Sequence, residues 1–202
     1  MTVVSLPTPS APFPPAGEIR RFSVDEYHEL IRIGLLRAHE RVELLEGWIV
    51  EKMTHNPLHD VVVDRVHEAI RDRVPREWRV RVQSAMTLDD SEPEPDLVVA
   101  RGPADRYLKQ HPGAPDIALL VEVADTSLGR DRHKSRINAR AGVRAYWIVN
   151  LPESVVEVYT DPTGPDAQPR YRNTERFSIG GAVPLAIAGQ SLPPLPVQEM
   201  LP

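Results

Sequence analysis

The chain has 202 residues, a net charge of −5, 41% hydrophobic and 26% charged residues, and no cysteine. This composition suits one globular domain with ragged ends, and the lack of cysteine excludes disulfides, a cysteine nucleophile and thiolate metal sites. The negative net charge argues against nonspecific coating of nucleic acid, which needs many cationic phosphate contacts, although it is compatible with a local basic groove.

Proline is concentrated at both ends of the chain, with five of the 21 prolines between residues 7 and 15 and four between residues 193 and 202. The sequence therefore predicts a flexible Pro-rich tail over residues 1–19, a folded domain over residues 20–192 and a Pro-rich C-terminal end over residues 193–202. No apolar run approaches the ~20 residues that cross a bilayer. The N-terminus also lacks the features of a signal peptide, so we expect a cytoplasmic protein with no membrane partner.

The first half of the domain carries clear signals for helix starts and for a turn. The motif Ser-Val-Asp-Glu at residues 23–26 has a hydroxyl at the N-cap and a carboxylate three residues later, which predicts a short helix. Residues 41–50 predict a β-hairpin that turns at Glu46-Gly47. Asn56-Pro57 predicts the start of a second helix, about 16 residues long.

The second half contains short apolar runs separated by one helical segment. A helix is predicted from about Arg132 to Ala141, with Gly142 after its last turn. The order of helix, hairpin, helix, strands, helix and strands predicts an α/β fold with a mixed central β-sheet flanked by helices. The strands of that sheet are predicted at residues 80–84, 96–100, 117–123, 145–149 and 155–159.

The common short catalytic motifs are missing from this sequence. There is no G-x-S-x-G, no Gly-rich dinucleotide or phosphate loop and no H-E-x-x-H. Asp60, Asp64 and His67 have helical spacing, but a helical wheel places them on the polar face, so we interpret them as a solvated surface. His59 lies within the apolar arc of that helix and is either a core histidine or an accessory residue of a site.

Four charged side chains are predicted to converge on one point. Asp96 follows Pro95 at the mouth of an apolar strand, and Glu122 lies inside another, where a carboxylate is costly unless it is paired or bound to a cation. Lys134 lies on the inward face of the following helix, and Glu43 alternates with apolar residues in the hairpin.

Two converging carboxylates repel each other, and Mg²⁺ would relieve the repulsion because it binds through a few carboxylates and keeps several waters. A metal acidifies a bound water, and a nearby lysine can orient or deprotonate that water, which together outline a phosphodiester hydrolysis site. A buried salt-bridge cluster without catalysis is the alternative interpretation of the same residues.

An ordered set of short motifs resembles the Uma-type branch of the PD-(D/E)xK restriction-endonuclease-like nucleases. The resemblance spans about residues 20 to 171. In chain order the motifs are Arg41-Val-Glu-Leu-Leu-Glu-Gly47, His59 early in a helix, Pro95-Asp96, Val121-Glu-Val123, Asp131-Arg-x-Lys134 and Gly142-Val-x-x-Tyr-Trp-Ile-Val149.

The resemblance implies a restriction-endonuclease-like fold and a role for each matching residue. Asp96, Glu122 and the carbonyl of Val123 would bind Mg²⁺ or Mn²⁺, and Glu43 would be an accessory acid. The signature lysine would stand at position 124, which is alanine here; in this branch it moves to the next helix, where Lys134 stands. The branch commonly has tyrosine four residues after that lysine, whereas this chain has asparagine.

The implied function is a metal-dependent endonuclease that acts on DNA, with a homodimer supplying two sites for double-strand cleavage. Replacing Lys134 with alanine would then abolish cleavage at little cost in stability. A non-catalytic module that keeps the fold and binds protein or nucleic acid is the alternative. A basic stretch could contact phosphates, although a solvated helix face explains it equally well; it comprises Arg130, Arg132, Lys134, Arg136, Arg140 and Arg144.

Overall fold

The computed structural model describes residues 19–37 and 40–202, so nearly all of the predicted N-terminal tail lies outside the described residues. In the first half the elements are α1 (Val24–Arg32), β1 (Val42–Leu45), β2 (Trp48–Glu51), α2 (Pro57–Arg71), β3 (Trp78–Val82), β4 (Leu97–Arg101) and two short 3₁₀ helices, η1 (Ala104–Tyr107) and η2 (Ala114–Asp116). In the second half they are β5 (Ile117–Ala124), α3 (Leu128–Arg140), β6 (Ala145–Asn150), β7 (Val155–Pro162), β8 (Tyr171–Ser178), β9 (Ala182–Ile187), β10 (Gln190–Pro196) and α4 (Val197–Met200).

Six strands form the central sheet in the order β3-β4-β5-β6-β7-β8. Strands β5 and β6 are parallel, and all other neighbours in this sheet are antiparallel. Parallel neighbours need a crossover connection, and α3 provides it between β5 and β6. The predicted α/β fold with a mixed sheet flanked by helices is therefore confirmed.

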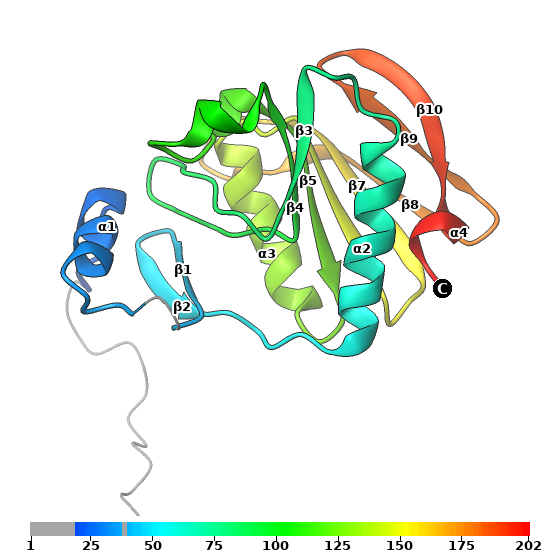
Figure 1. Ribbon diagram of the computed structural model, residues 1–202. Helices are drawn as coiled ribbons and strands as arrows, with labels where there is room; N and C mark the ends of the chain where they lie inside the picture. Colours follow the sequence, from blue (N-terminus) through cyan, green and yellow to red (C-terminus); the bar gives the residue numbers. More distant parts are fainter. Residues whose placement is uncertain (1–18, 38–39) are drawn as a thin grey trace, which may run out of the picture.

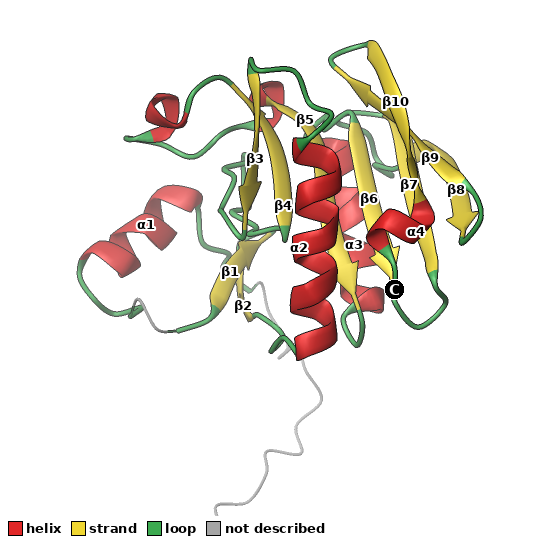
Figure 2. Cartoon of the chain, turned by 45° about the vertical axis from the view of Figure 1, so that its right-hand side comes forward, coloured by secondary structure: helices red, strands yellow, loops and turns green. Residues whose placement is uncertain are grey.

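The two faces of this sheet are covered by different helices (Figures 1 and 2). Because side chains alternate along a strand, Val121 and Val123 of β5 pack with α2 and with the β9–β10 hairpin. Leu120 and Ala124 of β5 point the other way and pack with α3. Glu122 has the same parity as these two residues, so its carboxylate is directed toward α3.

The N-terminal hairpin β1–β2 is attached to the loop that leads into β4. The backbone N–H of Glu92 donates to the carbonyl of Leu44 at 2.7 Å, and that of Gly47 donates to the carbonyl of Asp90 at 2.8 Å. Gly47 has a φ of +78°, and a Cβ there would lie 2.5 Å from the Cβ of Arg21, so the turn requires glycine. These contacts bring the hairpin beside the segment that carries Asp96.

The predicted helix starts are confirmed for α1 and α2 and are wrong for α3. Ser23 and Glu26 form the expected capping box, and the side chain of Asn56 caps α2. Helix α3 begins at Leu128 instead of Arg132 because its first turn forms at Ser127. The carbonyl of Ser127 accepts hydrogen bonds from the backbone N–H groups of Arg130 and Asp131. No helix in the described part of the chain is long and apolar enough to span a membrane.

The C-terminal segment is part of the fold, and the predicted end of the domain at residue 192 is too early. Strand β10 contains Pro193 and Pro194 at a register shift in its pairing with β9, where a missing N–H is tolerated. Leu195, Val197 and Met200 are fully buried against the α2 side of the sheet. Hydrophobic packing therefore extends the ordered domain to the end of the chain.

Candidate active site

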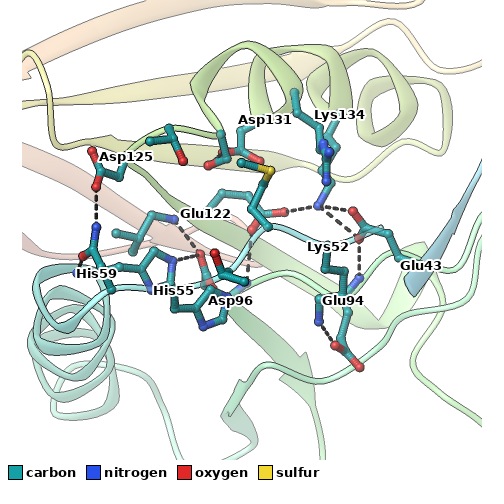
Figure 3. Close-up of a pocket in the computed structure, with 17 residues that line it drawn as sticks. Glu43, Lys52, His55, His59, Glu94, Asp96, Glu122, Asp125, Asp131 and Lys134 are labelled. Carbon is teal, nitrogen blue, oxygen red and sulfur yellow. Dashed lines mark hydrogen bonds and ion pairs between the residues drawn. The ribbon is translucent and has the colours of Figure 1, made fainter. Parts of the chain in front are cut away.

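One pocket opens where the start of β4, the end of β5 and the first turns of α2 and α3 meet the β1–β2 hairpin (Figure 3). The structure brings all the sequence-predicted site residues to this pocket. Its lining includes Glu43, His59, Asp96, Glu122, Val123 and Lys134. These residues come from five separate elements or loops, so only the tertiary fold brings them together.

Asp96 caps an unpaired position of the neighbouring strand. Pairing between β4 and β5 ends at Leu97 and Val121, so the N–H of Val123 has no backbone partner on that side. The Oδ2 atom of Asp96 accepts this N–H at 2.8 Å. It also accepts a hydrogen bond from Nε2 of His59 at 3.2 Å. No hydrogen bond from a described residue reaches the other oxygen, Oδ1, which leaves it available for a ligand.

Lys134 links two buried carboxylates (Figure 3). Its Nζ lies 3.1 Å from Oε1 of Glu122 and 2.9 Å from Oε1 of Glu43, and its side chain is 8% exposed. Burial by itself favours the neutral amine, but the carboxylates of Glu122 and Glu43 outweigh it and raise the pKa of Lys134. Burial raises the pKa of Glu122 well above its usual range, and the ammonium of Lys134 opposes this rise.

This arrangement corrects the expectation that losing Lys134 costs little stability. That expectation assumed a surface lysine, whereas the residue is buried between two acids. Removing the ammonium would leave two carboxylates buried without a counter-charge, which is strongly destabilising.

Of the two glutamates in the hairpin motif, Glu43 is the one that faces the pocket. Its Oε2 atom accepts a hydrogen bond from the backbone N–H of Glu94 at 3.2 Å. The same atom also accepts a hydrogen bond from Nζ of Lys134. Glu46 instead pairs with Arg136 and Arg140 on the outer side of α3. Glu43 lies within β1, whereas Glu46 lies in the turn after this strand and has a φ of +50°.

His59 is buried, and its contact is with a site carboxylate. Because a carboxylate only accepts hydrogen bonds, Nε2–H of His59 donates to Asp96. Burial would lower the pKa of His59, but the hydrogen bond and the charge of Asp96 raise it. Burial would likewise raise the pKa of Asp96, and the hydrogen bond from His59 lowers it. The pair thereby keeps Asp96 ionised.

Several residues that line the pocket were not predicted as site residues from the sequence, among them Lys52 and Asp131. Asp131 is 3% exposed, accepts the hydroxyl of Ser127 at 2.5 Å, and has its pKa raised to about 6 by burial. Lys52 follows β2 directly and forms an ion pair with Glu94. The scarcity of lysine, three residues in all, was the signal that could have drawn attention to Lys52.

The predicted basic stretch of α3 is largely neutralised by acidic side chains. Arg140 donates to Asp90 at 2.6 Å, Arg136 pairs with Glu46, and Arg132 pairs with the buried carboxylate of Glu157. A phosphate would have to displace these acids. Of the two interpretations of this stretch, phosphate contacts and a solvated helix face, these ion pairs favour the solvated face for the three arginines.

The donor set of the pocket fits a hard divalent cation. Four buried carboxylates face only two buried cationic side chains, Lys134 and His59; these acids are Glu43, Asp96, Glu122 and Asp131. Oxygen donors of this kind suit Mg²⁺ or Mn²⁺. The N–H and C=O of one strand residue point to the same side, so the carbonyl of Val123 also faces Asp96.

A second group of potential ligands is less suitable for one ion. Ligand atoms of His55, His59 and Asp60 lie within 4.8 Å of one another. The two imidazoles are stacked, with centroids 4.3 Å apart and planes at 18°. Because each nitrogen lone pair lies in its ring plane, stacked rings do not direct their lone pairs to one point.

Comparisons with known proteins agree with the fold. The model of the Uma2 family, described as "Putative restriction endonuclease", matches residues 24–194. A search of curated proteins finds no match. Among solved structures, a putative nuclease belonging to DUF820 from Anabaena variabilis is similar, with 19% identity and a TM-score of 0.65. The match covers 89% of this chain and 97% of that one.

Proposed function

The chain belongs to the Uma2 family of restriction-endonuclease-like proteins, and from this premise we propose that it is a divalent-metal-dependent nuclease that hydrolyses phosphodiester bonds in DNA. The observation that carries the proposal is the shared pocket of Asp96, Glu122 and Lys134. A salt bridge with only a structural role would need one carboxylate to balance the charge of one lysine. The pocket instead holds more buried carboxylates than buried cations, and a divalent ion would balance them.

Asp96, Glu122 and the carbonyl of Val123 are the proposed ligands of Mg²⁺ or Mn²⁺. The Oδ1 atom of Asp96 accepts no hydrogen bond from a described residue, and each oxygen of Glu122 accepts one and keeps a second lone pair. When bound, such a metal polarises a phosphate and acidifies a water molecule.

The remaining residues prepare the site for that cation. His59 holds Asp96 in its ionised form through the Nε2–H hydrogen bond. Lys134 fixes the position of Glu122, and Glu43 fixes Lys134 from the opposite side. Because its pKa is raised, Lys134 stays an ammonium and contributes positive charge. It is thus a positioning residue and not the base that removes a proton from water.

The test is cleavage of supercoiled plasmid DNA with Mg²⁺ or Mn²⁺, with and without EDTA. We expect cleavage that EDTA stops and that Asp96→Asn lowers by at least 10²-fold, as for loss of a key electrostatic group. Asp64→Asn is the matched control because Asp64 is exposed on the polar face of α2. Cleavage that survives both EDTA and Asp96→Asn would point to a contaminant. A folded protein that binds Mn²⁺ but cuts no DNA would favour the non-catalytic module.

A further inference from the structure

Lys52 lines the pocket and pairs with an acid that is partly exposed. It follows β2, its side chain is 14% exposed, and it lines the same pocket as Asp96 and Glu122. Its one acidic partner among the described residues is Glu94, which is 36% exposed (Figure 3). Because Glu94 is partly solvated, this pair can open without leaving a buried carboxylate unpaired.

Two nearby cations, Lys134 and Arg132, pair with more deeply buried acids than Lys52 does, while Arg130, which also lines the pocket, donates to the backbone carbonyl of Glu51. Lys134 is buried between Glu43 and Glu122, and releasing it would leave both carboxylates unpaired. On α3, Arg132 pairs with the buried carboxylate of Glu157. Lys52 is therefore the lysine of this pocket that can change partner at the lowest cost.

We propose that Lys52 is the residue that contacts a phosphate of the bound nucleic acid, exchanging Glu94 for a phosphate oxygen. The inference rests on the proposed nuclease function and adds a substrate-contacting residue that the motif resemblance does not include. A lysine ammonium is a compact charge on a flexible stem, so it can move from a carboxylate to a phosphate without a change in the backbone. Beside a scissile phosphate it also stabilises the negative charge that develops during hydrolysis.

Two measurements test the proposal on the full chain. The first is the affinity for a short fluorescein-labelled DNA duplex at several salt concentrations, with Ca²⁺ in place of Mg²⁺. Loss of one phosphate contact by Lys52→Met should reduce the slope of log K against log[salt] by about 0.9. The second is the cleavage rate with Mg²⁺, where we expect kcat to fall roughly 10²-fold.

Three further variants separate a phosphate contact from a structural role. Lys52→Arg keeps the charge and should restore the salt slope, while Lys109→Met, at an exposed lysine outside the pocket, should match the parent. Glu94→Gln breaks the same ion pair but leaves the cation in place, so DNA binding should be retained or tighter. If Glu94→Gln loses as much affinity as Lys52→Met, Lys52 acts through its pair with Glu94 and the proposal is wrong.

The outcomes also distinguish this inference from the proposed function. Metal-dependent cleavage with a salt slope unchanged by Lys52→Met would overturn the role of Lys52 alone. A parent that binds DNA without cleaving it, together with a reduced slope for Lys52→Met, would overturn hydrolysis and support the phosphate contact. A parent that binds no DNA would overturn both.

Discussion

The ammonium of Lys134 lies 2.9 Å from the carboxylate of Glu43, a residue 91 positions earlier in the chain. This contact joins the N-terminal hairpin to the helix that crosses over between β5 and β6. It makes the hairpin a component of the candidate site and gives the buried acid of β1 a counter-charge.

Replacing Lys134 with alanine should lower the free energy of unfolding by roughly 3–5 kcal/mol, because two carboxylates would lose their buried counter-charge. Urea denaturation at pH 7 measures this change, with Lys109→Ala as the exposed control. A loss below about 1 kcal/mol would contradict this prediction, because it would mean that the two acids do not depend on Lys134 for their burial. Saturating Mg²⁺ should recover part of the loss, because a bound cation replaces the missing charge.

Replacing His59 with alanine should weaken Mn²⁺ binding by roughly 10–100-fold, the usual effect of removing a partner that orients a metal ligand. Without the hydrogen bond from Nε2, the Asp96 carboxylate loses an interaction that lowers its pKa. Isothermal titration calorimetry provides the measurement, and His67→Ala, two turns further along α2 and not among the residues that line the pocket, is the control. Unchanged Mn²⁺ affinity in the His59 variant would argue that Asp96 does not ligate the metal.

Replacing Asp131 with asparagine should stabilise the protein in a pH-dependent way. The folded pKa of Asp131 is raised from 3.8 to about 6, so the folded state binds the proton more tightly than the unfolded state. Stability from this group is thus fully present below pH 3.8 and is lost as the pH rises through about 6. The gain for Asp131→Asn should grow across that window, to about 3 kcal/mol at most by pH 7.

Denaturation of the parent and Asp131→Asn at pH 4, 5, 6 and 7 gives this dependence directly. Asparagine can still accept the hydroxyl of Ser127, so the comparison isolates the charge. A difference between the two proteins that stays constant over the window would show that Asp131 titrates normally in the folded state.

The sequence predicted the main site residues because each carries a local signal. Glu122 interrupts an apolar strand, and Asp96 follows a proline at a strand mouth. Glu122 lies in a strand that is buried on both faces, and Asp96 directly precedes the buried strand β4, so their burial could be expected without knowledge of distant contacts. The same reasoning found β5 and β6, whose residues are almost all apolar.

Contacts that depend on tertiary packing could not be predicted from the sequence. The pair of Lys52 and Glu94 forms only because the hairpin packs on the loop before β4, 42 positions later. Strand β8 is exposed at most positions and lacks apolar alternation, so its sequence does not predict a strand. Backbone pairing with β7 holds it in the extended conformation. Likewise, the prolines between residues 193 and 202 predicted a flexible C-terminal end. The apolar residues among them, Leu195, Val197 and Met200, instead pack into the core.

Position 124, where the motif resemblance would place a lysine, belongs to the hydrophobic core. Ala124 is fully buried on the α3 side of the sheet, in the same cluster as Ile137. Introducing lysine at that position would place a charge among apolar side chains, while removing Lys134 first would leave two carboxylates unpaired. Each single step between the two arrangements therefore passes through a destabilised protein.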